Sequence, residues 1–324
     1  MRLLITGVTG MLGNNLAQAA NSRGHEIVSL SRSGPSHPSL RGLNCQHISA
    51  DITSKDLRHR LAHLRVDAVI HSAALIHIGW KRREEAIFIN RSGTENLLRW
   101  AEAQRVRFIH VSTVNVLPVG TEDSPSDETS QGDGQVPCTY VISKRAAQQA
   151  FMESVSRGLD GYSVYPGFML GPNDWQLSSG RMIRALKSFQ PWAPSGGCSV
   201  CDPRDVSEGI LALAQHGGKH RHYILAGHNT SYFDLWTSIA RKLGVRPPLV
   251  VMRKPARVIG NLLANGLNLL RREESDFNSA AIEMAQQFHY YSSRRAEEEL
   301  GYHPRPLHES IDDAIHWLRT HDYL

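Results

Sequence analysis

Cysteine is scarce in this chain, and its few thiols are scattered. Only 4 of the 324 residues are cysteine. Cys198 and Cys201 form a lone C-x-x-C pair, while Cys45 and Cys138 lie far from it in the sequence. A zinc site would need two further ligands at a suitable spacing. The sequence therefore predicts neither a disulfide framework nor a metal centre.

Long runs of positive charge are also absent, although the net charge is +5 and the sequence pI is about 9.1. Proteins that bind nucleic acids gather Lys and Arg on one element, so this class is not expected. The small positive net charge suits an anionic ligand, but a general excess of positive charge on the surface explains it better.

No hydrophobic stretch is long enough to cross a bilayer. The longest, at residues 258–270, contains three asparagines and is too short. Glycines interrupt the apolar start of the chain, which does not fit a secretory signal. We therefore expect no integral membrane segment and a cytoplasmic protein. Residues 258–270 have one apolar helical face with arginines at both ends, as interfacial membrane helices do, but packing on the protein is the favoured interpretation.

What the chain does contain is a strand, a glycine turn and a helix at its start. An apolar run at residues 2–6 leads into Gly7, Gly10 and Gly13. Gly7 can adopt a positive φ, Gly10 leaves room for a phosphate, and Gly13 lets the helix pack closely on the strand. A second strand follows the helix, which is the context that a dinucleotide site requires. The turn predicts a diphosphate bound at the helix N-terminus.

Strands alternate with helices along the first half of the chain. We expect strands at residues 25–30, 45–51, 66–71, 106–112 and 162–165, and helices at residues 11–23, 54–64, 87–104 and 140–157. The strand at 106–112 is nearly continuous in apolar residues, as is typical of a parallel strand buried on both faces. The alternation predicts an α/β fold with a Rossmann-type, doubly wound parallel sheet.

The alternation weakens after Pro166. A helix at residues 206–216 and a strand at 223–226 are expected to return to the sheet. We therefore predict a dinucleotide-binding Rossmann domain at residues 1–170 plus 203–228, and a smaller, discontinuous C-terminal substrate lobe at residues 171–202 plus 229–324. Ligands of such sheets bind at the carboxyl ends of the strands.

Tyr140 and Lys144 form the second strong feature. Residues four apart share one helix face, with Cβ atoms about 5–6 Å apart. A lysine ammonium beside a phenol favours the phenolate and lowers the pKa of the tyrosine, which can then exchange a proton with a carbonyl or alcohol oxygen. Such a pair also occurs on solvated helix faces. Its position is more specific, because the preceding strand ends in Ser112 and Thr113.

Eight segments in this order resemble the extended short-chain dehydrogenase/reductase superfamily, which includes the NAD-dependent epimerases and dehydratases. They are residues 6–13, 50–52, 71–74, 90–94 and 111–113, Tyr140 with Lys144, Pro166 with Gly171 and Pro172, and Asp205 with Val206. The resemblance extends over nearly the full length. It points to the branch of dihydroflavonol-4-reductases and 3β-hydroxysteroid dehydrogenases.

The resemblance implies a role for each matching residue. Tyr140 would be the general acid/base, Lys144 its activator and a ligand of the nicotinamide ribose, and Thr113 the third catalytic residue, with Ser112 as the alternative. The cofactor would also contact Gly7, Thr9, Gly10, Met11, Leu12, Gly13, Arg32, Asp51, Ile52, Ala73, Ala74, Asn90, Pro166, Gly167 and Met169. The substrate would contact Leu75, His77, Asn115, Phe168, Trp175 and Met182. For Asn90 and for the aromatic residues, packing in the core is an equal alternative.

The end of the second strand bears on the choice of cofactor. Relatives that use NAD carry an acid there, whereas this chain has Ser31 followed by Arg32. An acid repels a 2′-phosphate, and an arginine offers it a bidentate contact. We therefore expect NADP(H) rather than NAD(H).

The residues after the catalytic hydroxyl bear on the reaction. Dehydratases carry Asp-Glu where this chain has Val114 and Asn115, and epimerases carry Tyr-Gly near the place of Leu117 and Pro118. We expect an oxidoreductase that interconverts a ketone and a secondary alcohol on a largely apolar small molecule. A sugar-nucleotide epimerase and a non-catalytic NADP-binding regulator are the alternatives, and the Tyr/Lys pair argues against the regulator. The superfamily commonly pairs through the helices before and after the fifth strand, so a homodimer is expected.

Overall fold

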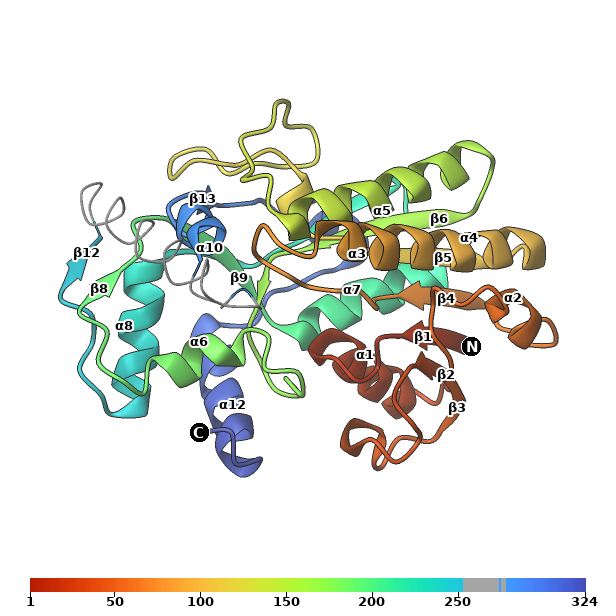
Figure 1. The fold of residues 1–324 in the computed structure, drawn as a ribbon, viewed down its shortest axis with the longest axis horizontal. Coiled ribbons are helices and arrows are strands. Elements are labelled where there is room, and N and C mark those ends of the chain that lie inside the picture. The colour runs from red at the N-terminus through yellow and green to blue at the C-terminus, as the bar shows by residue number, and fades with distance from the viewer. Residues whose placement is uncertain (253–273, 275–277) are drawn as a thin grey trace.

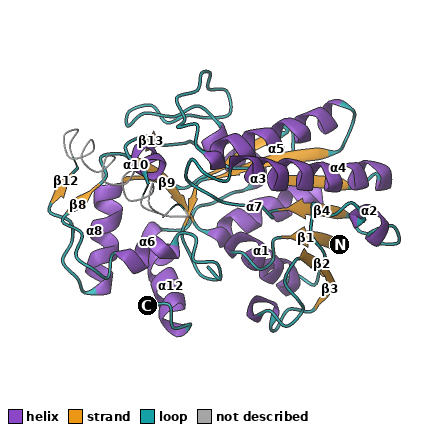
Figure 2. Ribbon diagram, viewed as in Figure 1, coloured by secondary structure: helices purple, strands orange, loops and turns teal. Residues whose placement is uncertain are grey.

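The computed structural model describes residues 1–252, residue 274 and residues 278–324. A fully parallel sheet forms its centre (Figures 1 and 2). Its strands are β1 (Arg2–Thr6), β2 (Glu26–Ser31), β3 (Cys45–Ser49), β4 (Ala68–His71), β5 (Arg107–Val111), β6 (Gly161–Pro166) and β10 (His222–Leu225). The order β10-β6-β5-β4-β1-β2-β3 reverses direction between β4 and β1. The predicted Rossmann fold is confirmed, and β10 returns to the sheet as expected, paired with β6.

Helices cover both faces of this sheet (Figure 1). One layer contains α1 (Met11–Ser22) and α7 (Pro203–His216), and the other contains α3 (Arg83–Ile87), α4 (Gly93–Gln104) and α5 (Thr139–Ser156). Successive strand side chains point to opposite faces. Leu3 and Ile5 of β1 therefore share a core with α1 and α7, whereas Leu4 shares one with α4 and α5. Burial on both faces explains the apolar runs of the strands.

A second, smaller sheet lies beyond the carboxyl ends of these strands (Figure 2). Its central strand, β9 (Gly197–Cys201), pairs with β7 (Phe168–Met169), β11 (His228–Ser231) and β13 (Phe288–His289). The other elements of this part are α6 (Gly180–Ala185), β8 (Trp192–Ala193), α8 (Tyr232–Leu243), β12 (Val250–Val251), α10 (Ser279–Met284), α11 (Arg294–Leu300) and α12 (Leu307–Thr320). The division into a Rossmann domain and a substrate lobe at the residues given above stays a prediction.

Two predicted helices differ in the structure. The helix expected at residues 54–64 is the single turn α2 (Leu57–Arg60). Asp51 explains its late start, because its carboxylate accepts hydrogen bonds from the Thr53 N–H (2.8 Å) and hydroxyl (2.7 Å) and so favours a turn. The helix expected at residues 87–104 begins earlier, in α3, and passes through a π-helical turn at Phe88–Ser92 before α4.

The features that were scarce in the sequence are scarce in the fold as well. The described residues contain no group of three or more His, Cys, Asp or Glu side chains that could hold a metal ion. Cys198 and Cys201 are free thiols buried in β9. No helix in the described part of the chain is long and apolar enough to span a membrane. The helix predicted at residues 258–270 lies outside the described residues.

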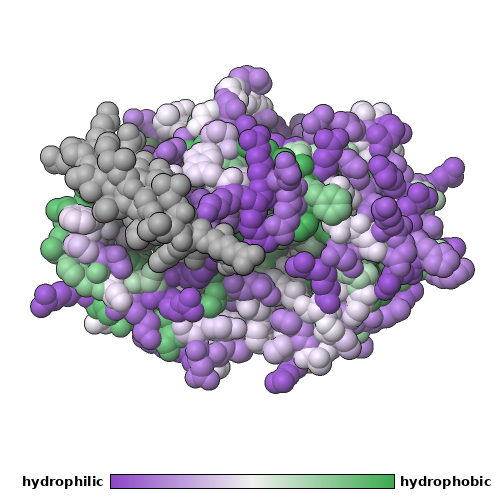
Figure 3. Space-filling model, viewed as in Figure 1, coloured by the Kyte–Doolittle hydropathy of each residue, from purple (hydrophilic) through white to green (hydrophobic). Residues whose placement is uncertain are grey.

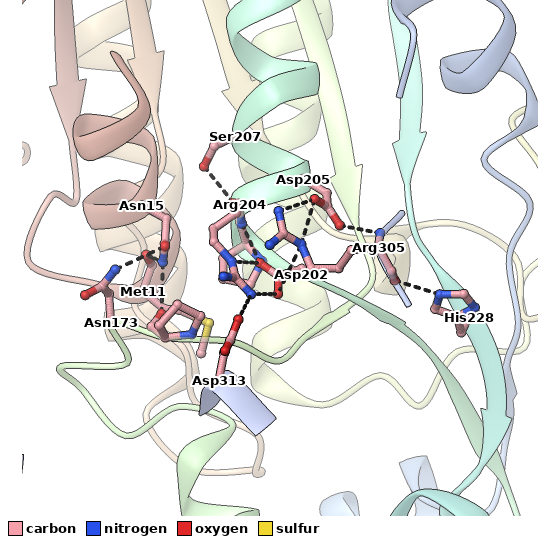
Figure 4. Close-up of polar contacts among 12 residues, drawn as sticks. Met11, Asn15, Asn173, Asp202, Arg204, Asp205, Ser207, His228, Arg305 and Asp313 are labelled. Atoms are coloured by element: carbon pink, nitrogen blue, oxygen red, sulfur yellow. Dashed lines mark hydrogen bonds and ion pairs between the residues drawn. The ribbon is translucent and has the colours of Figure 1, made fainter. Parts of the chain in front are cut away.

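Charged side chains join the start of α7 to the last part of the chain (Figure 4). Asp202 caps α7 by accepting the Arg204 N–H (2.9 Å), and the Arg204 guanidinium lies 2.7 Å from both Asp202 and Asp313 of α12. Asp205 accepts hydrogen bonds from the Arg305 N–H (2.7 Å), Nε (2.9 Å) and Nη2 (2.6 Å). Asp202 and Asp205 are buried. The C-terminal residues are thus held on the large sheet by paired buried carboxylates.

Candidate active site

The glycine turn after β1 leaves the N-terminus of α1 open. Gly7 has a φ of 77°, and a Cβ there would lie 2.8 Å from Ser72 Oγ. A Cβ on Gly13 would lie 2.2 Å from the Gly7 carbonyl oxygen, so only glycine lets α1 approach the turn this closely. A Cβ on Gly10 would meet only that same oxygen, at 3.4 Å. Helix α1 has neither a side-chain cap nor an acid in its first turn. The turn therefore fits a diphosphate bound by backbone N–H groups.

The other predicted residues of this segment differ in exposure. Thr9 is half-buried in the turn, and its carbonyl oxygen accepts a hydrogen bond from Gln176 Nε2 (3.4 Å) of the C-terminal part. Met11 and Leu12 begin α1 and are buried in the core. Only their backbone N–H groups could reach a ligand.

The ends of β1 and β4 are joined at the point where the strand order reverses. The Thr6 hydroxyl bonds His71 Nδ1 (2.8 Å) and accepts the Ala73 N–H (3.1 Å), and the Ser72 hydroxyl donates to the Thr6 carbonyl oxygen (2.7 Å). His71 Nε2 bonds the Thr94 hydroxyl (3.0 Å). Burial lowers the pKa of His71 to about 3, so its ring is neutral. Ala73 and the following Ala74 are half-buried at this edge, where open α/β sheets bind ligands.

A pocket of about 370 Å³ lies beyond the ends of β2 and β3, lined by Arg32, Ser49, Ala50, Asp51, Ser54 and Arg60. Two of the sequence-predicted residues, Arg32 and Asp51, meet here. Arg60 of α2 brings a second guanidinium, which also donates to Asp56 Oδ2 (2.7 Å) and to the Ser49 carbonyl oxygen (3.3 Å). The sequence analysis missed Arg60. Its place shortly after Asp51, on the element that follows β3, is the signal that would have found it.

Ile52 lies beside this pocket and packs against α4. A Cβ on Gly93, the first residue of α4, would lie 2.5 Å from Ile52 Cδ1. The side chain of Ile52 is buried, so it can offer a ligand in the pocket only an apolar contact.

Two hydroxyl side chains follow β5, and one of them meets Tyr140. Thr113 lies beside Tyr140 and acts on the pKa of its phenol as a hydrogen-bonding neighbour, and its Oγ1 accepts the Asn115 N–H (3.3 Å). Ser112 Oγ is buried and has no hydrogen-bond partner among the described residues. The backbone thus turns Thr113, and not Ser112, toward the start of α5.

Lys144 lies one turn after Tyr140 on α5, and its Nζ donates to the Val111 carbonyl oxygen (2.8 Å) at the end of β5. Burial lowers the pKa of Lys144 to about 8. Burial also raises the pKa of the Tyr140 phenol, and the hydrogen bond with Thr113 offsets only part of this effect. The expected lowering of the Tyr140 pKa by Lys144 is therefore wrong, because the ammonium is directed at the strand end while the phenol is desolvated.

Asn90 occupies the π-helical turn, and its amide is fully engaged within the protein. Its Oδ1 accepts the Leu75 N–H (2.7 Å), and its Nδ2 donates to the Leu75 carbonyl oxygen (3.0 Å) and to Ser143 Oγ (2.9 Å) on α5. The residue connects the loop after β4 to the helix that carries Tyr140. This geometry makes Asn90 a positioning residue for that loop.

The loop after β4 borders the start of α5. The Thr139 N–H donates to the Gly79 carbonyl oxygen (2.8 Å), which places this loop next to Tyr140. His77 Nε2 lies 3.1 Å from a carboxylate oxygen of the buried Glu274. The same carboxylate accepts the N–H groups of residues 80 and 81. Sequence reasoning missed Glu274, because nothing local in the chain indicates a contact nearly two hundred residues away.

The segment after β6 passes from the large sheet to the small one. Gly167 follows Pro166, and a Cβ on it would lie 2.4 Å from the Ser199 carbonyl oxygen of β9. Phe168 packs against the core of the C-terminal part, and Met169 packs against the core of the large sheet. This crossing lies directly beyond the carboxyl end of β6.

The remaining predicted substrate residues lie in the C-terminal part. Trp175 Nε1 donates to Asn14 Oδ1 (3.2 Å) of α1, and its ring meets Trp317 of α12 edge-on at 5.1 Å. Met182 of α6 packs against the same core. The structure therefore places Trp175 between the two parts of the molecule, and it does not bring either side chain into contact with Tyr140.

Residues 3–226 match the NAD-dependent epimerase/dehydratase family. The chain belongs to this family. The match spans the glycine turn, the end of β5 and the pair Tyr140 and Lys144. The predicted resemblance to the extended short-chain dehydrogenase/reductase superfamily is thereby confirmed, as is the enzyme class.

Several related proteins match this chain over nearly its full length. A putative dihydroflavonol 4-reductase of Synechocystis is 27% identical and covers 99% of this chain and 95% of its own length. A 4-hydroxy-2-methyl-3-oxo-4-farnesyl-3,4-dihydroquinoline-1-oxide ketoreductase of Stigmatella aurantiaca is 27% identical, over 97% of this chain and 96% of its own. The crystal structure of gox2253 superposes with a TM-score of 0.83 at 28% identity and covers 99% of both chains.

Proposed function

We propose that this protein is an NADP-dependent oxidoreductase that interconverts a ketone and a secondary alcohol on a largely apolar small molecule. The observation that carries the proposal is the position of Thr113 beside Tyr140 at the end of β5, with Lys144 one turn further along α5 and its Nζ on the Val111 carbonyl oxygen (2.8 Å). Two relatives that match nearly the whole chain have reductase names, which supports the same reaction class.

In the reductive direction, the two hydroxyls act on one substrate oxygen. The reduced nicotinamide supplies the hydride when it is bound. Thr113 donates a hydrogen bond to the carbonyl oxygen and orients it, and Tyr140 transfers its hydroxyl proton to that oxygen. Lys144, whose Nζ donates to the Val111 carbonyl oxygen, would hold the nicotinamide ribose one turn further along α5. Burial raises the pKa of Tyr140, so the phenol holds the proton that reduction consumes.

The substrate binds on the side of Tyr140 formed by the loop after β4 and the segment after β6. Leu75 is held by Asn90, His77 by Glu274, and Phe168 by the small sheet. Two of these three side chains are apolar, which suits an apolar substrate with one polar contact at His77. The ketoreductase of Stigmatella aurantiaca is likewise named for a ring compound that carries an oxo group.

The 2′-phosphate of NADP fits the pocket of Arg32 and Arg60. Both guanidinium groups line it, together with the Ser49 and Ser54 hydroxyls. A charge-assisted contact strengthens binding by roughly ten- to a hundred-fold. We expect Arg32→Ala and Arg60→Ala each to lower the affinity for NADPH by about tenfold and to leave the affinity for NADH unchanged. Arg58→Ala, on the same turn but outside the pocket, is the matched control. Equal losses for both cofactors would contradict the NADP assignment.

A panel of ketones with NADPH tests the reaction itself. We expect turnover with cyclic and aromatic ketones, and a loss of about a hundred-fold or more in kcat for Tyr140→Phe. The NADPH affinity of this variant stays unchanged, because the ring is retained. Cofactor that co-purifies tightly without any net oxidation would instead indicate a sugar-nucleotide epimerase.

We also propose that the protein works in the cytoplasm as a homodimer. Helices α4 and α5 lie side by side on one face of the molecule (Figure 1). Phe88 and Met152 on this face are 56% and 39% exposed, so a partner copy would cover apolar side chains there. Light scattering on the purified protein tests the dimer, and a monomer would contradict it.

A further inference from the structure

The far end of the C-terminal part carries an exposed apolar surface. Strands β8 and β12 form a short parallel ribbon, in which Val250 pairs with Trp192. The large apolar side chains on and next to the ribbon are exposed: Phe189 (45%), Trp192 (55%), Leu249 (68%), Val250 (49%) and Val251 (41%). We call these five residues the ribbon patch. The ribbon lies at the left edge of the molecule in Figure 1, and hydrophobic atoms are visible at that edge in Figure 3.

The ribbon patch is held in place by the backbone. The Leu249 N–H donates to the Pro191 carbonyl oxygen (3.0 Å), and the Met252 N–H donates to the Ala193 carbonyl oxygen (2.7 Å). These bonds and the ribbon pairing keep the apolar side chains on an ordered framework. Monomeric proteins rarely expose contiguous apolar patches without a binding partner.

The chain segments that lead into and out of the ribbon patch contain cationic residues and no acids. Residues 175–201 and 235–252 contain no Asp or Glu. These segments form α6, the ribbon and most of α8. Their six cationic side chains are all exposed: Arg181, Arg184, Lys187, Arg241, Lys242 and Arg246.

Few acids face this end from the neighbouring elements. Asp312 of α12 pairs with Lys242, with an oxygen 2.5 Å from Nζ. Asp234, at the start of α8, is hydrogen-bonded to Ser231, and this end of α8 lies near β8, because the Tyr232 N–H donates to the Gly196 carbonyl oxygen (3.0 Å). In the described part of the chain, Arg184, Lys187, Arg241 and Arg246 therefore leave these segments with a positive balance after Lys242 has paired with Asp312.

We propose that the ribbon patch docks on an anionic lipid surface. Trp and Phe side chains are favoured at the boundary between headgroups and acyl chains, and nearby Lys and Arg attract anionic headgroups. A second copy of this chain fits less well, because a two-fold contact would bring the same cations face to face. The contact is peripheral, since only side chains of the ribbon enter the bilayer. This inference does not depend on the proposed reaction.

Flotation of the full chain with vesicles tests the proposal. We expect binding to vesicles of phosphatidylglycerol and phosphatidylcholine in equal amounts, weaker binding at higher salt, and no binding to phosphatidylcholine alone. Trp192→Ser and Leu249→Ser should each reduce the bound fraction by about tenfold at limiting lipid. Arg184→Glu with Lys187→Glu should do the same through charge, which keeps the test independent of the apolar variants.

Matched controls separate the ribbon patch from general stickiness. Ile76→Ser removes an apolar side chain of nearly equal exposure, 53%, in the loop after β4, and Lys219→Glu reverses an exposed charge elsewhere. Both controls should bind vesicles as the unaltered protein does. Three results would overturn the proposal: no binding to anionic vesicles, ribbon variants that bind normally, or light scattering in which Trp192→Ser turns a dimer into a monomer.

Discussion

Ser112 and Thr113 are neighbours with opposite surroundings at the end of β5. Thr113 lies beside the Tyr140 phenol, while Ser112 Oγ is buried and has no partner among the described residues. Removing a hydrogen bond to a reacting oxygen costs about 10²- to 10³-fold in kcat, which we expect for Thr113→Val. Ser112→Ala should keep its activity, because it removes an unpaired buried hydroxyl. Steady-state kinetics of both variants with NADPH decide the assignment, and an inactive Ser112→Ala would transfer the role to Ser112.

His110, the next-to-last residue of β5, is a buried polar side chain that lacks hydrogen-bond partners among the described residues. Both ring nitrogens are buried and have no partner in the described part of the protein, and the ring stacks on Phe151 at 5.3 Å. Burial holds the pKa of His110 well below its usual range. The folded protein therefore keeps this ring neutral, whereas the unfolded chain takes up a proton below a pH of about 6.5.

The unpaired ring predicts an acid-sensitive contribution to stability. Because the folded pKa is the lower one, stability falls as the pH drops below about 6.5, by about 1.4 kcal/mol per pH unit for this group. In His110→Phe this contribution is absent, and the ring stacking is retained. Urea unfolding between pH 7 and pH 5 should therefore give a smaller loss of unfolding free energy for the variant. Parallel pH curves for the two proteins would show that His110 finds a partner in the folded state.

At the level of the element, Gly10 just before α1 and Gly13 in its first turn have different tasks. A Cβ on Gly13 would lie 2.2 Å from the Gly7 carbonyl oxygen, whereas one on Gly10 would find that oxygen at 3.4 Å. Gly13→Ala should therefore lower the free energy of unfolding by about 1–3 kcal/mol through overpacking. Gly10→Ala should fold normally but bind NADPH about tenfold more weakly, because its methyl group occupies the diphosphate space. Denaturation and fluorescence titration separate the two effects, and unaltered NADPH binding by Gly10→Ala would remove the diphosphate from this turn.

The elements that the sequence predicted well are those with local causes. Most strands of the large sheet stand out in the sequence as apolar runs, since both of their faces are buried, whereas β3 at the edge is polar and partly exposed. The π-helical turn at Phe88–Ser92 does not, because its Asn90 is held by Leu75 and Ser143, two residues brought together only by the fold. The same limit explains why Glu274, which anchors His77 across the chain, was missed.

The pKa of Tyr140 shows the same limit at a single group. Spacing on a helix correctly placed Lys144 one turn away, but the direction of the pKa shift depends on burial and on where the ammonium points. The spacing of two residues on a helix gives neither the burial of the phenol nor the direction of the ammonium. Arg60 could be predicted only in part. Its position shortly after Asp51 can be read from the sequence, but whether it lines the pocket of Arg32 depends on how the short α2 is placed.

At the scale of the whole molecule, the two sheets are connected through a few charged residues. Asp205 lies at the start of α7 below the large sheet, and Arg305 precedes α12 of the C-terminal part (Figure 4). The pair fixes the C-terminal segment relative to α7, and His228 of the small sheet adds a bond to the Arg305 carbonyl oxygen (2.8 Å). The ion pair between Asp205 and Arg305 therefore helps to fix the position of the small sheet relative to the large one.

Removing Arg305 tests how strongly this connection stabilises the protein. The Asp205 side chain is 8% exposed and receives two side-chain bonds from Arg305. Arg305→Met leaves that carboxylate buried without its cation, which typically costs about 3–5 kcal/mol. Arg294→Met is the matched control, because Arg294 is 83% exposed and pairs only with the exposed Glu298. We expect the urea midpoint to fall clearly for Arg305→Met and to stay unchanged for Arg294→Met. If both variants unfolded at the midpoint of the parent protein, the charged connection would contribute nothing to the joining of the two sheets, and apolar contacts such as those of Trp175 would have to account for it.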